Sequence, residues 1–181
     1  MNQLKLNIRK VLEMTRMNRG MYSSKDDCAT TPRDLFETLD REFHFEVDVC
    51  ATPETALCKK FWTPEDNCLS FNWGRTTCFM NPPYGKKIRD FMLHALLAAR
   101  HGATVVCLVP ARTDTKWWHD TCWAAQEWRF IKGRLKFGSS KGEPKSNAPF
   151  PSAIVIFRPR ELGEEYKPLV VRGCNKLGEM L

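Results

Sequence analysis

Apolar residues are grouped along this chain in two patterns, continuous runs and helical stripes. Residues 103–110 form a continuous apolar run, which is typical of a strand buried on both faces of a sheet. Residues 76–80 form a shorter run of mostly β-branched and apolar side chains, which two prolines then end. A stripe with helical spacing separates the two runs and consists of Ile88, Phe91, Met92, Ala95, Leu96 and Ala99. This order of strand, helix and strand predicts an α/β domain with a mostly parallel sheet and flanking helices.

Further elements are predicted on the N-terminal side of this unit. Residues 43–49 alternate well enough for a strand that ends in an acid, Asp48. Before it, Thr31 and Pro32 form a helix-start signal, with Thr31 as the N-cap and Pro32 at the first helical position. The helix that follows has an apolar face made of Leu35, Phe36 and Leu39.

The C-terminal half contains a helix, three strands and a long loop. We expect Thr113 or Asp114 to be the N-cap of the helix. The three strands are expected at residues 127–132, 134–137 and 152–157. Residues 138–149 form a polar loop rich in Gly, Ser and Lys, and its length is typical of a functional or mobile loop.

The length of 181 residues suits one domain with a sizeable core. We expect a basic N-terminal arm at residues 1–22, the main domain at residues 23–160, and a loosely held C-terminal tail at residues 161–181. No apolar run approaches the 18 residues of a membrane-spanning helix, and the N-terminus does not resemble a secretory signal. These features predict a cytoplasmic protein.

The net charge of the chain indicates its type of partner, and its cysteine content bears on disulfides and metal sites. The formal net charge of +7, with a pI near 9.1, favours a polyanionic partner. The eight cysteines form no Cys-x-x-Cys pair, and several lie in apolar strand-like segments. We therefore interpret them as reduced thiols, mostly in the core, and expect neither a disulfide framework nor a metal site.

The tetrapeptide Asn81-Pro82-Pro83-Tyr84 suggests a specific chemistry. It follows the predicted strand 76–80, and open α/β sheets bind their ligands at the carboxyl ends of strands. The amide oxygen of Asn81 and the backbone carbonyl of Pro82 are both acceptors, so together they can hold an amino group by its two hydrogens. Tyr84 offers a flat face for a planar ring. A planar ring with an exocyclic amine describes adenine, cytosine or guanine.

These four residues resemble the [DNS]-P-P-[YFW] motif of amino-methyltransferases that use S-adenosylmethionine (SAM). The Thr-Pro helix start, the Asp48–Ala51 segment, residues 133–137 and residues 149–152 are similar to phage-type DNA N6-adenine methyltransferases, the Dam-like family. The resemblance covers roughly residues 31–157. It implies a single-domain Rossmann-like methyltransferase fold with an antiparallel strand near the C-terminus, in the cytoplasm of a bacterial or phage-infected cell.

The resemblance also implies a reaction and a set of residues for it. The reaction is methyl transfer from SAM to the N6 amine of adenine in double-stranded DNA, with base flipping and with Asn81 to Tyr84 as catalytic residues. The residues implied for SAM are Thr31, Pro32, Asp48, Ala51 and Asp66. The Gly-x-Gly loop of many SAM enzymes is absent, and Ala51 and Thr52 stand at the corresponding place.

Contacts to DNA are expected from basic and aromatic residues near the site, namely Arg112, Arg134, Lys136, Phe137, Lys141, Lys145 and Phe150. Three alternatives stay open from the sequence. In the first two, the enzyme acts instead on guanine or adenine amines of RNA, or on a glutamine amide of a protein. In the third, the chain is a catalytically dead nucleic-acid-binding module of the same fold.

Overall fold

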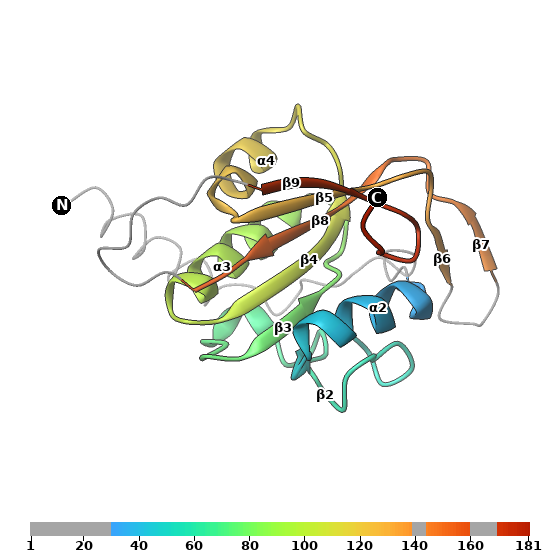
Figure 1. Cartoon of the computed structure of the whole chain (residues 1–181). Coiled ribbons are helices and arrows are strands. Elements are labelled where there is room, and N and C mark those ends of the chain that lie inside the picture. The colour runs from blue at the N-terminus through green and yellow to red at the C-terminus, as the bar shows by residue number, and fades with distance from the viewer. Residues whose placement is uncertain (1–29, 139–143, 160–169) are drawn as a thin grey trace.

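The computed structural model describes residues 30–138, 144–159 and 170–181. Within these residues the main sheet has seven strands in the order β2-β1-β3-β4-β8-β5-β9 (Figure 1). The strands are β1 (Val47–Asp48), β2 (Lys60–Phe61), β3 (Thr77–Met80), β4 (Thr104–Pro110), β5 (Glu127–Ile131), β8 (Ser152–Phe157) and β9 (Val170–Cys174).

Strand direction confirms the predicted fold class. The four strands β2, β1, β3 and β4 are parallel to one another. The strand β8 runs antiparallel between β4 and β5, and β9 is parallel to β5. The sheet is therefore mostly parallel with one antiparallel strand near the C-terminus. Every residue of β8 is buried, as is nearly all of β4, because helices cover both faces of the sheet at these strands.

Helices cover the sheet from both sides (Figure 1). The helix α2 (Arg33–Phe43) packs on one face, in a cluster with Phe79 of β3. The helices α3 (Ile88–Arg100) and α4 (Lys116–Thr121) pack on the other, in a cluster with Cys78 and Met80. Neighbouring residues of β3 therefore point to opposite faces, as the period of a strand requires. Two short 3-10 helices, η1 (Cys68–Ser70) and η2 (Cys122–Ala124), complete the second layer.

A two-stranded antiparallel hairpin lies beside the main sheet. It consists of β6 (Lys136–Gly138) and β7 (Pro144–Asn147). In Figure 1 this hairpin lies on the side toward which β4 runs, which is the carboxyl edge of the parallel strands. Gly138 also pairs with Thr30, since the backbone N–H of each residue donates to the carbonyl of the other at 3.0–3.1 Å. The segment that enters α2 is thereby attached to the hairpin.

Several predicted element boundaries are wrong. Helix α2 begins at Arg33 with Pro32 as its N-cap, so Thr31 does not cap it and Pro32 is not its first helical residue. The strand predicted at 43–49 is reduced to Val47–Asp48, because Phe43 ends α2 and the chain then turns through His44 in the left-handed conformation.

Two further starts are shifted. Helix α4 begins at Lys116, and its N-cap is Thr115 and not Thr113 or Asp114. Thr115 instead donates its hydroxyl back to the carbonyl of Arg112 in a turn. Strand β6 begins at Lys136, two residues later than expected. Local capping signals did not distinguish between neighbouring polar residues.

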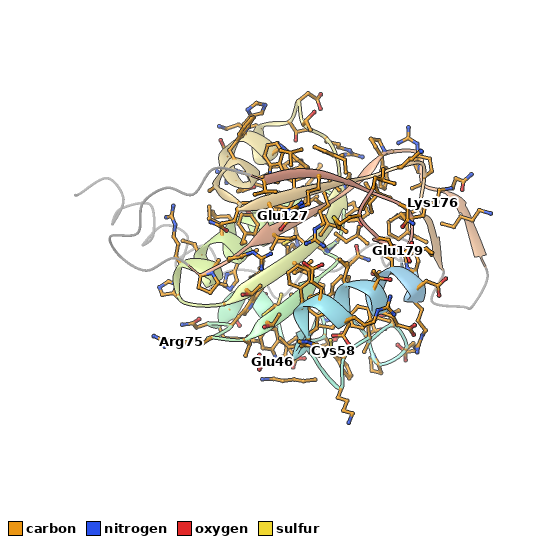
Figure 2. All side chains as sticks on the ribbon, viewed as in Figure 1. Glu46, Cys58, Arg75, Glu127, Lys176 and Glu179 are labelled. Carbon is orange, nitrogen blue, oxygen red and sulfur yellow. The ribbon has the colours of Figure 1, made fainter. Side chains whose placement is uncertain are left out.

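The described part of the C-terminal tail is not loosely held. Residues Val170–Cys174 form β9, paired in register with β5. The chain then turns back, and Leu181 donates its backbone N–H to the carbonyl of Gly173 at 3.1 Å. Figure 2 shows Lys176 and Glu179 on this turn, above the start of α2. The predicted boundary at residue 161 itself stays a prediction.

Within the described parts of the chain, no helix is both long enough and apolar enough to span a bilayer. The cysteines in these same parts are all free thiols. Cys28 lies outside them.

Candidate active site at the carboxyl edge of the sheet

The order of the parallel strands reverses between β1 and β3. From β1 the chain adds β2 on one side and later β3 on the other, with Asp48 in register with Phe79. Open α/β sheets bind ligands in the crevice outside the carboxyl ends of the strands at such a switch point. Asp48 ends β1, and Asn81 directly follows β3. The structure therefore brings these two predicted site residues to the two sides of the switch point.

The side-chain amide of Asn81 makes hydrogen bonds on both of its ends. Its Nδ2 donates to Oγ1 of Thr31 at 3.0 Å. Its Oδ1 accepts from the hydroxyl of Tyr84 at 2.7 Å, and this hydroxyl also lies 3.2 Å from the carbonyl oxygen of Leu108 in β4. The acceptor oxygen of the amide thus lies on the Tyr84 side, and the donor nitrogen lies on the Thr31 side.

The ring of Tyr84 packs between two phenylalanines in edge-to-face contact. The ring centroids lie 6.0 Å from Phe137 and 5.5 Å from Phe150, with interplanar angles of 76° and 80°. Burial raises the pKa of Tyr84, so its hydroxyl keeps its proton and can donate it. The guanidinium of Arg112 lies over Phe150, 5.6 Å from the ring centroid. Two of the predicted substrate-contacting residues, Phe137 and Phe150, therefore contact Tyr84 of the predicted catalytic motif, and a third, Arg112, lies against Phe150.

Asp48 is a buried carboxylate with an exposed fraction of only 3%. Its Oδ1 accepts from the backbone N–H of Cys50, and its Oδ2 accepts from that of Leu57, both at 3.3 Å. Burial raises the pKa of Asp48 from 3.8 to about 6, because the two long hydrogen bonds only partly offset desolvation. The carboxylate therefore connects the beginning and the end of the loop that follows β1.

These features fit a SAM site. The ionised form of Asp48 is incompletely compensated, so hydroxyl or ammonium donors of a ligand at the switch point would stabilise it. Ala51, which is 4% exposed, donates its backbone N–H to the carbonyl of Trp62 and joins the loops after β1 and β2. A small residue at this place lets the two loops approach each other. The loop is thus held without the Gly-x-Gly sequence.

Asp66 lies in the loop after β2, which ends at the same edge of the sheet. Its Oδ2 accepts from both the backbone N–H and the hydroxyl of Thr63, at 2.7 and 3.0 Å. This oxygen therefore already stabilises a local turn, and a contact between Asp66 and the cofactor stays a prediction. The same holds for Pro32, which lies next to Thr31 at the start of α2.

The expected DNA contacts divide by exposure. Arg112, Arg134 and Lys136 are exposed at the carboxyl edge of the sheet or on the adjoining hairpin. Phe150 is half-buried, whereas Phe137 is only 5% exposed and packs in the core beneath Tyr84. Lys141 lies outside the described residues. Lys145 lies in β7, but its side chain is outside what the structure describes.

Sequence reasoning missed two partners in this site. The carbonyl of Leu108 reaches the Tyr84 hydroxyl because β4 is the neighbour of β3 in the sheet. Thr31 reaches Asn81 across fifty residues of sequence. No local signal points to either contact, since both depend on which strands and segments become neighbours.

Comparison with known proteins agrees with this geometry. The family model described as DNA N-6-adenine-methyltransferase (Dam) matches residues 20–177. A DNA N-6-adenine-methyltransferase of Haemophilus phage HP1 (strain HP1c1) is 32% identical over 152 residues, which cover 81% of this chain and 86% of the relative. One of Escherichia phage T1 is 30% identical over 111 residues, covering 60% and 46%. The chain therefore belongs to the DNA N-6-adenine-methyltransferase (Dam) family.

Proposed function

We propose that this adenine-specific DNA methyltransferase takes its methyl group from SAM held at the switch point between β1 and β3. Asn81 and the carbonyl of Pro82 then hold the target amine. The observation that carries the proposal is the Asn81 amide, which lies at the carboxyl end of β3 and presents its acceptor oxygen on the Tyr84 side.

The two acceptors act on the adenine amine by position and by electrostatics. The Asn81 Oδ1 and the Pro82 carbonyl accept the two hydrogens of the amine, which draws the nitrogen lone pair out of conjugation with the ring. Pro83 contributes no N–H that would compete for these acceptors. Bound SAM supplies an electrophilic methyl group on a sulfonium for that lone pair. Holding the amine in this orientation converts binding energy into rate.

The cofactor is proposed to lie against the backbone of Thr31 and Pro32, the loop at Ala51, and the carboxylates of Asp48 and Asp66. The location at the switch point and the partly uncompensated burial of Asp48 support this arrangement. Because Asp48 is ionised above about pH 6, it can accept from hydroxyl or ammonium groups at neutral pH.

Double-stranded DNA is the proposed substrate, and the target base must leave the duplex. Rotation of the nucleotide out of the stack costs a few kcal/mol. Stacking on Tyr84 would recover about 1–3 kcal/mol of this cost. Arg112, Arg134 and Lys136, together with Lys141 and Lys145, would contact the backbone, while Phe137 and Phe150 support or extend the aromatic surface. The enzyme would act in the cytoplasm of the cell that holds this DNA.

The test is transfer of tritiated methyl groups from SAM to duplex DNA, RNA and protein, with Asn81→Ala beside the parent. We expect transfer to DNA, recovered as N6-methyladenine, and a loss of about a hundredfold or more for Asn81→Ala. The affinity for SAM, measured by calorimetry, should stay near that of the parent, since the amide acts on the amine and not on the cofactor. A matched control is Asn72→Ala, an exposed asparagine whose amide only caps the turn at Gly74.

Each alternative has its own outcome. Turnover of Asn81→Ala within threefold of the parent would remove Asn81 from the reaction. Transfer to RNA or to protein glutamine in place of DNA would show that RNA or a protein, and not DNA, is the substrate. An absence of SAM binding by the parent would favour a dead module.

A further inference from the structure

The Asn81 amide is held by two hydrogen bonds of opposite sense. Thr31 accepts from its nitrogen, and Tyr84 donates to its oxygen. Exchanging the two ends of the amide would place the Asn81 nitrogen beside the hydroxyl hydrogen of Tyr84. That exchange would also turn two N–H donors toward the hydrogens of a target amine, which repels them. Only one orientation of the amide therefore suits the reaction.

Thr31 is itself rigidly placed. It is 6% exposed, and the preceding residue Thr30 forms an antiparallel bridge with Gly138 of β6 through two backbone hydrogen bonds. A Cβ on Gly138 would lie 3.3 Å from the Cβ of Thr30, so the two segments are in close contact. Pro32, which follows Thr31, is the N-cap of α2. Thr31 is thus fixed between the hairpin and the helix.

The same strand β6 supports the other end of the amide. Phe137, the residue before Gly138, packs its ring edge-to-face with Tyr84. One short strand therefore positions both side chains that contact the Asn81 amide. This arrangement is not required for a helix cap, because α2 begins without a side-chain cap.

We propose that Thr31 is a positioning residue for catalysis, whose hydroxyl oxygen fixes the Asn81 amide with its oxygen toward the target amine. The inference rests on the proposed role of Asn81. This role differs from a contact between the Thr31 side chain and the cofactor, because loss of the hydroxyl should lower turnover and leave SAM affinity unchanged. Loss of one such oriented hydrogen bond lowers kcat about tenfold.

The experiment compares Thr31→Val, which keeps the shape but removes the acceptor, with Thr31→Ser, which retains the hydroxyl. Three quantities are measured: kcat at saturating SAM and DNA, the SAM dissociation constant by calorimetry, and the melting temperature. Thr121→Val is the matched control, since Thr121 is also buried but donates its hydroxyl within α4, to the carbonyl of Trp117. Thr31→Ala against Thr31→Ser repeats the comparison should valine disturb folding.

We expect kcat to fall about tenfold in Thr31→Val, with SAM affinity within twofold of the parent, and to recover in Thr31→Ser. The control Thr121→Val should keep the parent kcat. The inference is overturned if Thr31→Val and Thr31→Ala turn over like the parent, or if Thr31→Ser is as slow as they are. A loss of SAM affinity with kcat retained also overturns it and makes Thr31 a cofactor contact. Failure of the proposed function is seen separately, as full activity in Asn81→Ala.

Discussion

At the scale of single residues, the switch point combines a neutral amide with a buried carboxylate. Asn81 makes short hydrogen bonds to side chains, whereas Asp48 makes only long ones to backbone N–H groups. The pKa of Asp48 is raised to about 6 because burial disfavours its charged form. The ionised form of this group is the stronger acceptor for hydroxyl and ammonium donors.

The first prediction at this scale concerns pH. We expect SAM affinity to rise as pH increases through about 6, because Asp48 then ionises and can accept from the cofactor. Asp48→Asn should bind SAM more weakly at pH 8 and lose this pH dependence. Calorimetry at several pH values measures both effects, with Asp66→Asn as the second predicted cofactor residue. If both variants match the parent at every pH, the cofactor site is built elsewhere.

The same pKa has a consequence for stability. The folded pKa of Asp48 exceeds the unfolded value, so the folded state binds more protons between about pH 4 and pH 6. The contribution of this group to the free energy of unfolding therefore falls as pH rises, by about 2 kcal/mol between pH 4 and pH 8. Asp48→Asn should lose this contribution. Chemical denaturation of parent and variant at both pH values measures it, and parallel pH profiles would contradict it.

At the scale of elements, a cluster of charged residues joins α2 to the C-terminal strands. Arg129 of β5 is 3% exposed and pairs both terminal nitrogens with the carboxylate of Glu42 at 2.6 Å. Its Nε donates to Glu127 at 2.8 Å, and Glu127 also accepts from Arg158 and Arg172. Glu127, which is labelled in Figure 2, accepts hydrogen bonds from all three arginines. The cluster therefore connects the helix with β5, with the end of β8 and with β9.

Removing Arg129 should be costly. Arg129→Ala leaves Glu127 without its closest partner but still paired with Arg158 and Arg172, so we expect a cost of about 1–3 kcal/mol of unfolding free energy, below that of a buried charge left with no partner. Glu42 is nearly half exposed, so solvent screening reduces the contribution of its ion pair with Arg129 to the free energy of unfolding. Urea denaturation measures the change. Arg41→Ala, at an exposed arginine of the same helix, should stay within about 0.5 kcal/mol of the parent. A similar small change in Arg129→Ala would show that the cluster adds little.

At the scale of the whole molecule, the chain has a net charge of +7, and basic residues are exposed at both edges of the sheet. Arg112, Arg134 and Lys136 are exposed on the side of the switch point, where we propose that DNA approaches Asn81. Arg75 and Arg100 are exposed at the opposite edge, before β3 and at the end of α3. Figure 2 shows Arg75 far from the hairpin.

DNA affinity should fall steeply with salt, because each neutralised phosphate releases counterions. We expect Arg134→Ala with Lys136→Ala to reduce the slope of log K against log salt by about 2, at about 0.9 for each lost phosphate contact. The matched control, Arg75→Ala with Arg100→Ala, removes the same charge from the other edge. Fluorescence anisotropy with labelled duplex measures both slopes. Equal slopes for the two double variants would mean that net charge, and not the hairpin, determines binding.

The sequence by itself determined the elements whose signals are local. The apolar run of β4 and the helical stripe of α3 appear where their periods predict them, and the Asn81 to Tyr84 motif lies at the end of a strand. These features depend on neighbouring residues, because a short segment already shows whether its side chains are apolar on both faces or along one helical stripe. Residue types in the motif already predicted its chemistry.

The tertiary structure alone decided which of these residues meet. Thr31 contacts Asn81, and Tyr84 contacts Leu108, across long stretches of chain. The strand β9 has no strong pattern of its own and forms because β5 offers it an edge, with Arg172 reaching Glu127. Such contacts depend on strand order and register, which result from packing the whole sheet at once. The orientation of the Asn81 amide is therefore a property of the fold, while the presence of an asparagine at this position is a property of the sequence.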